Sequence, residues 1–315
     1  MLGASGAIGR EAARALTAQG HDLVCFLRRG ADLGAAAPSQ AALRFGAPAN
    51  AASLRRDGFA GERFDAVVSC LASRSGAPAD AWAIDHDAHQ AALALAQEHG
   101  AAHFVLLSAL CVQKPRLAFQ HAKRAFETSL MQSGLRYSIV RPTAFFKSLS
   151  GQLDRLRAGK PYLLFGDGRL TACKPISAAD LGLYLAECLD DPERWNRILP
   201  IGGPGPAITP LEQGERLFEL LGRRPRYRRV PVALFDAIIA GLSLAARLRP
   251  ALAAKAELAR IGRYYATESM LVWDEAAGRY DAAATPSFGA ETLFEFYARL
   301  VRGEVSVERG DHAVF

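Results

Sequence analysis

The glycine-rich run at the start of the chain, Gly3-Ala4-Ser5-Gly6-Ala7-Ile8-Gly9, constrains the fold more than any other feature. Three glycines at this spacing allow a tight turn, a close approach of the backbone to a pyrophosphate, and close packing of the following helix. A helix is predicted from Ala7 to Gln19, and its N-terminal amides would face an anionic ligand. The sequence therefore predicts a dinucleotide site whose contacts come from Gly3, Ser5, Gly6, Ala7, Ile8 and Gly9.

The first half of the chain alternates short apolar runs with helical patterns. Strands are predicted at 22–27, 64–70, 103–107 and 137–140, and helices at 7–19, 85–99 and 117–133. This alternation predicts an α/β fold, a Rossmann-type doubly wound parallel sheet with helices on both faces. We assign residues 1–142 to the dinucleotide-binding domain. Residues 143–315, with helices predicted at 178–189, 210–221 and 290–302, form a smaller substrate-binding subdomain with segments returning to the main sheet.

The strand that should precede the glycine run is too short. Only Met1 and Leu2 come before Gly3, whereas a strand normally has about five or six residues. A start codon assigned too late, or a truncated gene, would produce such a sequence. We expect a chain with this short first strand to be destabilised relative to one with a whole strand.

The residues after the second predicted strand indicate which nicotinamide cofactor is bound. A carboxylate at this position binds the ribose 2′-hydroxyl of NAD, whereas arginine accommodates the 2′-phosphate of NADP. This chain has Arg28-Arg29 and no carboxylate there. The pair predicts NADP, with Arg28 as its main partner; the alternative is a solvated arginine pair.

A serine and a lysine stand where short-chain dehydrogenases have catalytic groups. Ser108 follows the strand at 103–107, and Lys123 lies on the next helix, four residues after Phe119. Residues four apart share one helix face, so Lys123 is predicted beside the nicotinamide ribose and Phe119 facing the reacting carbon. The family pattern has tyrosine where this chain has Phe119, which cannot protonate an alkoxide. Either the chemistry is therefore not carbonyl reduction, or the chain catalyses no reaction. The alternative for Lys123 is a surface lysine on a helix.

Composition excludes several other classes of protein. The net charge of +6 comes from mostly scattered basic residues, so no nucleic-acid partner is predicted. The five cysteines form no Cys-x-x-Cys pair, which argues against a disulfide framework or a zinc site and favours a reducing cytoplasm. A glycine-rich N-terminus cannot serve as the apolar core of a signal peptide.

The longest apolar stretch runs from Val230 to Ala246 and is interrupted by Asp236. It is somewhat short for a spanning helix, which needs about 20 apolar residues. We predict a helix buried in the second subdomain. The alternative is a helix resting on a membrane surface, which would give peripheral membrane contact if the substrate is lipophilic.

Many longer runs resemble the divinyl chlorophyllide a 8-vinyl-reductase family, and they cover most of the chain from Phe64 to Pro286. Among them are Ser69-Cys70-Leu71-Ala72-Ser73-Arg74, Trp82-Ala83-Ile84-Asp85, Cys111-Val112-Gln113-Lys114-Pro115, Arg141-Pro142-Thr143-Ala144-Phe145-Phe146-Lys147, Cys173-Lys174-Pro175-Ile176-Ser177 and Ile261-Gly262-Arg263-Tyr264-Tyr265-Ala266. The similarity is weaker from Gly30 to Gly61 and near the C-terminus. The chain departs from the pattern at its short first strand. It also has Gly46-Ala47 where related folds often have Gly-Asp near the adenine.

The resemblance implies an atypical short-chain dehydrogenase of chlorophyll or bacteriochlorophyll biosynthesis. It would use NADPH to reduce the 8-vinyl group of divinyl chlorophyllide or protochlorophyllide to ethyl. Further cofactor contacts are assigned to Cys70, Leu71, Ala72, Ser108, Lys123 and Pro142, with Lys123 as the catalytic residue. Phe119, Phe145, Phe146 and Tyr264 are assigned to the substrate, although core packing is an equal alternative for the two adjacent phenylalanines.

A conjugated vinyl group accepts hydride at its terminal carbon, and the charge spreads into the macrocycle. Lys123, Tyr264, Cys111 or water would then supply the proton, and Lys123 is assigned mainly to cofactor positioning. The run Arg223–Arg229 is a candidate for the substrate carboxylate, with a solvated basic strand edge as the stronger alternative. The magnesium belongs to the substrate, so no protein metal site is predicted. The rival functions are a non-catalytic NADP sensor, a sugar-nucleotide epimerase or reductase, and an accessory protein of a membrane complex.

Overall fold

The computed structural model describes residues 1–31, 41–249 and 252–307. The chain divides into two compact units. The first contains residues 1–73, 79–142 and 178–201, and the second contains residues 74–78, 143–177 and 202–315. The assignment of cofactor binding to residues 1–142 and of substrate binding to residues 143–315 stays a prediction.

The first unit is built on parallel strands. They are β1 (Val24–Arg28), β2 (Ala42–Gly46), β3 (Ala66–Ser69), β4 (His103–Leu107), β5 (Arg136–Pro142) and β7 (Arg197–Ile201). Strands β3, β4, β5 and β7 pair in that order, and β1 pairs with β2, all in parallel. Leu2 joins the two groups, because it forms parallel bridges to Phe26 of β1 and to Ser69 of β3. The strand order is therefore that of a doubly wound sheet with Leu2 at the position of the first strand, which confirms the predicted fold class.

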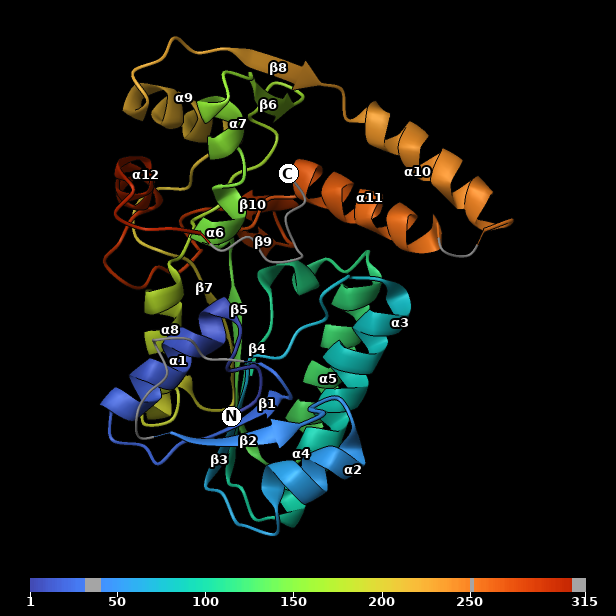
Figure 1. Cartoon of the computed structure of the whole chain (residues 1–315), viewed down its shortest axis with the longest axis vertical. Helices are drawn as coiled ribbons and strands as arrows, with labels where there is room; N and C mark the ends of the chain where they lie inside the picture. The colour runs from blue at the N-terminus through green and yellow to red at the C-terminus, as the bar shows by residue number, and fades with distance from the viewer. Residues whose placement is uncertain (32–40, 250–251, 308–315) are drawn as a thin grey trace. The chain divides into compact units, whose positions relative to one another are not determined.

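Helices cover both faces of this sheet (Figure 1). They are α1 (Ala7–Ala18), α2 (Ala51–Ser53), η2 (Leu54–Phe59), η3 (Trp82–Ala88), α4 (His89–Glu98), η4 (Leu110–Gln113), α5 (Ala118–Gln132), α8 (Ala178–Glu187) and η5 (Pro192–Arg194); α3 (Pro78–Ala81) lies at the boundary of the units. Helices α1 and α8 pack closely, since a Cβ on Gly182 would lie 2.6 Å from the backbone of Glu11. On the other face, Phe126 of α5 packs on Phe104 of β4 with ring centroids 5.8 Å apart.

The sequence predicted most of these elements within a few residues, with one difference of type. The predicted single helix at 85–99 is a π-helix, η3, followed by α4. A π-turn changes which side chains share a helix face, and such turns often occur at functional sites. Here it turns the carboxylate of Asp85 into the interior of the unit, where its side chain is fully buried.

The second unit contains two small sheets and six helices within its described residues. Parallel strands β6 (Tyr162–Phe165) and β8 (Tyr227–Val230) form one sheet, and antiparallel β9 (Val272–Asp274) and β10 (Arg279–Asp281) form the other. The helices are α6 (Phe146–Leu149), α7 (Leu153–Arg157), α9 (Pro210–Leu220), α10 (Ala233–Ala246), α11 (Leu252–Thr267) and α12 (Leu293–Arg302). Tyr297 of α12 is fully buried, and its hydroxyl donates to the carbonyl of Leu149 at 2.7 Å.

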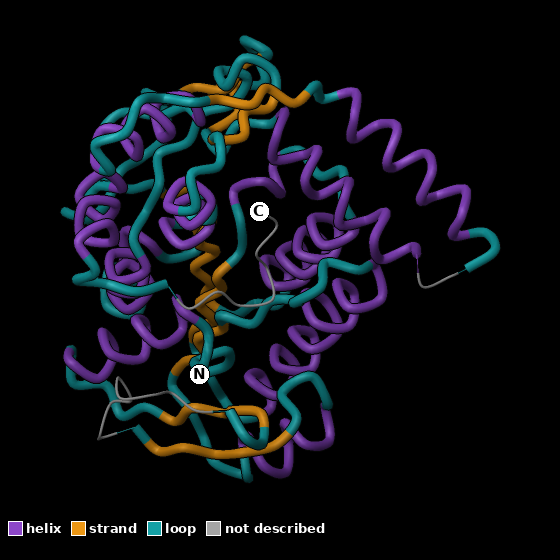
Figure 2. Tube along the Cα trace, turned by 45° about the horizontal axis from the view of Figure 1, so that its top comes forward, coloured by secondary structure: helices purple, strands orange, loops and turns teal. Residues whose placement is uncertain are grey.

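The prediction of a buried helix within 230–246 was wrong in one respect. The helix exists as α10, but none of its 14 residues, all of which the structure describes, is buried. It packs along α11 (Figure 2). Phe235 lies against Gly262, whereas Leu234, Ile238 and Leu244 are exposed. The apolar pattern predicted the helix correctly, but a pattern does not show how many faces a neighbour covers.

Buried His89, the first residue of α4, makes the stability of the first unit depend on pH. Its ring nitrogens bond Ser69 Oγ at 2.9 Å and the carbonyl of Ile84 at 2.9 Å. Burial, helped by the positive charge of Lys123, lowers the pKa of His89 to about 4. The imidazole is therefore neutral in the folded chain at pH values where the unfolded chain binds a proton.

We predict that the free energy of unfolding is highest above pH 6.5 and falls by up to about 3 kcal/mol as the pH falls toward 4. The sign follows because a lowered folded-state pKa makes the unfolded chain bind more protons over this range. Urea unfolding at several pH values should show this loss, and His89→Gln should flatten it. The matched control His86→Gln, three residues earlier, should leave the slope unchanged; equal slopes in wild type and His89→Gln would contradict the assignment.

Candidate functional site

The glycine loop has the close contacts that a dinucleotide site needs. A Cβ on Gly3 would lie 2.5 Å from the backbone of Cys70, and one on Gly9 would lie 2.1 Å from the carbonyl oxygen of Gly3. Gly3 also has φ = +74°, a conformation that favours glycine. The loop can therefore form only with glycine at these two positions, and it runs directly beneath the residue after β3.

The N-terminus of α1 is suited to an anion. Within the described part of the chain, no side chain caps α1 at Gly6, and its first turn has no acidic residue. Uncapped amides and the helix dipole favour a phosphate at this position. This observation fits the predicted contacts of Ser5, Gly6, Ala7 and Ile8, which stay predictions.

The other predicted cofactor residues of the first unit follow the carboxyl ends of parallel strands. Arg28 ends β1 and Arg29 follows it, and both are exposed. Cys70, Leu71 and Ala72 follow β3, Ser108 follows β4, and Pro142 ends β5. Parallel strands place these ends at one edge of the sheet, where ligands of open α/β sheets bind. Ribose 2′-phosphate binding by Arg28 stays a prediction, and the exposure of this residue is consistent with it.

Lys123 on α5 is held by a buried ion pair. Its Nζ lies 3.0 Å from Oδ1 of Asp85, and the two side chains are 10% and 0% exposed. Asp85 also accepts bonds from the hydroxyl of Ser73 at 2.7 Å and from its amide at 3.3 Å. Asp85 therefore ties Lys123 to the segment that directly follows Cys70–Ala72. Phe119, one turn earlier on α5, is half-buried.

Ser108 belongs to a second polar cluster. Its hydroxyl donates to Oε1 of Glu127 at 2.5 Å, and Glu127 is paired with the guanidinium of Arg141 on β5. Glu127 is 1% exposed, so the arginine and serine compensate its buried charge. Because the hydroxyl is the donor in this bond, the serine oxygen can still accept a hydrogen bond, and its cofactor contact stays a prediction.

Asp85, Glu127 and Arg141 were not among the predicted site residues. Glu127 could have been found, because it follows Lys123 by four residues on the same helix, as Lys123 follows Phe119. Asp85 had only a weaker signal, because it is one of several carboxylates in an alanine-rich helical segment. Its contact with Lys123 is tertiary and has no spacing rule.

Of the predicted substrate residues, Phe119 lies in the first unit and the other three lie in the second. Phe145 is half-buried just before α6, whereas Phe146 is 3% exposed and stacks on Phe296 with centroids 5.3 Å apart. Tyr264 of α11 is 4% exposed and lies against the ring of Tyr265. Phe146 thus has a packing partner, and its substrate role stays a prediction, as do those of Phe145 and Tyr264.

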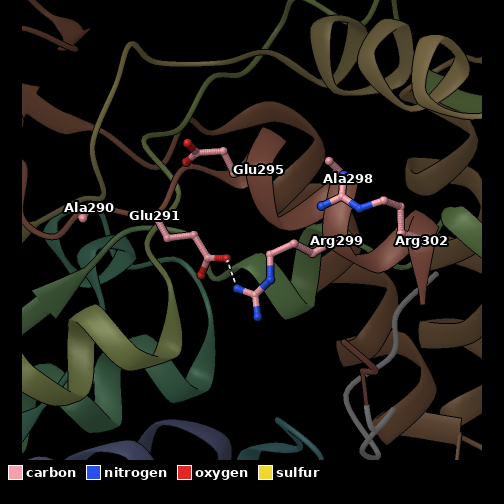
Figure 3. Close-up of a pocket in the computed structure, with 6 residues that line it drawn as sticks. All are labelled: Ala290, Glu291, Glu295, Ala298, Arg299 and Arg302. Atoms are coloured by element: carbon pink, nitrogen blue, oxygen red, sulfur yellow. Dashed lines mark hydrogen bonds and ion pairs between the residues drawn. The ribbon is translucent and has the colours of Figure 1, made fainter. Parts of the chain in front are cut away.

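A separate surface hollow lies along α12 (Figure 3). Glu291 and Arg299 form an ion pair of 2.6 Å across it, and Glu295 is bonded to Thr292 in the helix cap. These charges already compensate one another, and the hollow includes none of the predicted site residues. Within residues 1–31, 41–249 and 252–307, no cluster of three or more His, Cys, Asp or Glu side chains is arranged to hold a metal ion.

Comparisons with known proteins agree with this geometry. A family model described as NAD(P)H-binding matches residues 3–192. Solved structures share the fold at low sequence identity. A UDP-glucose 4-epimerase of Thermotoga maritima has a TM-score of 0.68 at 17% identity, covering 96% of each chain. An NADPH-dependent quinone oxidoreductase of Escherichia coli has a TM-score of 0.66 at 18% identity, covering 95% of this chain and 98% of that one.

Curated sequences give much higher identity. A chloroplastic divinyl chlorophyllide a 8-vinyl-reductase of Oryza sativa subsp. indica is 47% identical over all of this chain and 81% of its own length. The protein of the same name from Cucumis sativus is 52% identical over 80% of this chain and 61% of its own length. At this identity and coverage, the chain belongs to the divinyl chlorophyllide a 8-vinyl-reductase family.

Proposed function

We propose that this chain reduces the 8-vinyl group of divinyl chlorophyllide, or of its protochlorophyllide precursor, to ethyl, with NADPH as the reductant. Its membership of the reductase family along its whole length carries the proposal. The missing hydroxyl at Phe119 supports it, because the aromatic macrocycle delocalises the charge that a tyrosine would otherwise have to neutralise. One vinyl group, one NADPH and one proton give one ethyl group and NADP.

The residues of the first unit fit NADPH, which when bound supplies a hydride from its nicotinamide ring. The amides of the glycine loop and of the first turn of α1 would hold the pyrophosphate. Arg28 would bind the 2′-phosphate, with Arg29 as a second cation. The tight contacts at Gly3 and Gly9 support this role, because a dinucleotide-binding loop needs such a tight turn and such close packing of the following helix.

Lys123 would orient the nicotinamide ribose, and Asp85 would keep the ammonium in place. The ion pair supports this role because a lysine side chain has several rotatable bonds and would otherwise sample many positions. Correct orientation of the reacting groups contributes strongly to rate. Phe145, Phe146 and Tyr264 are proposed to contact the flat apolar substrate, for which aromatic walls are suited.

The choice of NADPH over NADH gives the first test. Arg28→Ala should raise the Kd for NADPH by about 10- to 100-fold, the value of one or two charge-assisted hydrogen bonds, and leave the Kd for NADH nearly unchanged. Quenching of protein fluorescence during titration measures both constants. Arg55→Ala removes an exposed arginine elsewhere in the first unit and is the matched control. Equal losses for the two cofactors, or no loss, would contradict the assignment of Arg28.

The activity test mixes the chain with NADPH and divinyl chlorophyllide a and follows the Soret-band shift on loss of the vinyl group. Wild type should convert the pigment, and Lys123→Met should lower turnover by about 100-fold or more. Lys123→Met alone leaves a buried carboxylate unpaired, which costs about 3–5 kcal/mol of stability. The double variant Lys123→Met/Asp85→Asn removes both charges, so it should recover stability but not turnover. NADPH binding without pigment conversion in wild type would favour a sensor, and an active double variant would contradict the role of Lys123.

A further inference from the structure

Apart from Asp236, Gly241 and Ser243, every residue of α10 is apolar, yet the residues that the structure describes cover only one side of this helix. Phe235 on the covered side stacks on Phe165 with centroids 4.9 Å apart and lies against Gly262 of α11. Leu234, Ile238 and Leu244 lie outside this contact and are 49%, 41% and 64% exposed. Apolar helix surface is normally buried, so these exposed residues call for a partner.

The bare residues form one stripe. Leu234, Ile238 and Leu244, together with Leu248 just beyond the helix, fall within about 120° at 3.6 residues per turn. Leu248 is 89% exposed. Figures 1 and 2 both show α10 and α11 side by side as a pair, so α11 covers one face and leaves the stripe open. Contiguous exposed apolar surface of this kind marks a contact site.

The sequence around the stripe is strongly basic. From Arg223 to Arg263 the chain has ten Arg and Lys residues against two acidic ones, a net charge of +8, whereas the whole chain carries +6. The two acids are already engaged, since Asp236 pairs with Arg263 and Glu257 pairs with Arg260. Eight cations therefore remain that no acid of the segment balances, among them the exposed Arg228 and Arg229 of β8.

We propose that α10 and the basic segment around it bind the surface of an anionic lipid bilayer, with the leucine stripe among the acyl chains and the arginines at the headgroups. An apolar helix face flanked by Lys and Arg is the combination that interfacial helices use. A second copy of the chain fits less well. A symmetric dimer through this face would bring two +8 segments together.

The length of α10 suits a helix that lies in the membrane plane. Its 14 residues extend about 21 Å, less than the ~30 Å of a hydrocarbon core. Among the residues that the structure describes, no helix is both long and apolar enough to cross a bilayer. The proposal does not depend on the proposed reaction, because its readout is binding to lipid in the absence of pigment.

The test is flotation of the full chain with vesicles of phosphatidylcholine alone or mixed with phosphatidylglycerol. Wild type should float with the anionic vesicles at low salt and much less at about 0.5 M salt. Leu244→Glu/Leu248→Glu should lower the vesicle-bound fraction about tenfold. The control Met131→Glu/Leu170→Glu adds the same charge at exposed apolar residues outside the stripe and should bind as wild type. Arg228→Gln/Arg229→Gln should weaken binding to anionic vesicles without adding charge to the stripe.

Three results would overturn the proposal: no binding of wild type to anionic vesicles, equal loss in the stripe and control variants, or a dimer in solution that the stripe variant dissociates. Loss of binding counts only if the variants melt as wild type does, and the arginine variant provides an independent test if the leucine variant fails to fold. Vinyl reduction in vesicle-free solution should be unchanged in the leucine variant. A failure of lipid binding is therefore distinguishable from a failure of the proposed function.

Discussion

The first unit depends on backbone hydrogen bonds on both sides of Leu2. The amide of Leu2 donates to Val68 and its carbonyl accepts from Cys70, while the amide of Phe26 donates to the carbonyl of Met1. These bonds join two groups of strands into one sheet, the pair of β1 and β2 and the group of β3, β4, β5 and β7. They also fix the direction in which the chain enters the glycine loop, so the position of this loop depends on the bonds of Met1 and Leu2.

The contacts of the candidate site can be traced from Leu2 to Lys123. The loop after Leu2 approaches the backbone of Cys70 so closely that Gly3 cannot carry a side chain. Ser73, three residues after Cys70, bonds Asp85, and Asp85 pairs with Lys123. The glycine loop, the segment after β3 and the lysine of α5 are thus connected through direct contacts. We consider Asp85 a positioning residue in this chain of contacts.

Local sequence patterns predicted the features that depend on local backbone geometry. The glycine spacing, the alternation of strands and helices and the four-residue step from Phe119 to Lys123 all follow from backbone geometry, and the elements appear where these patterns put them. The pairing of Asp85 with Lys123 joins residues 38 positions apart through a π-turn, which no spacing rule captures. The burial of α10 was predicted wrongly for a different reason. Hydrophobicity there correctly indicated a helix, but burial depends on what else reaches that face.

The central claim is that the chain delivers a hydride to the terminal carbon of the 8-vinyl group. NADPH deuterated at both C4 positions, incubated with the chain and divinyl chlorophyllide a, tests this claim directly. The account predicts one deuterium in the terminal methyl of the new ethyl group, seen by NMR and as a unit increase in pigment mass. An ethyl group without deuterium, or with deuterium on its inner carbon, would contradict it.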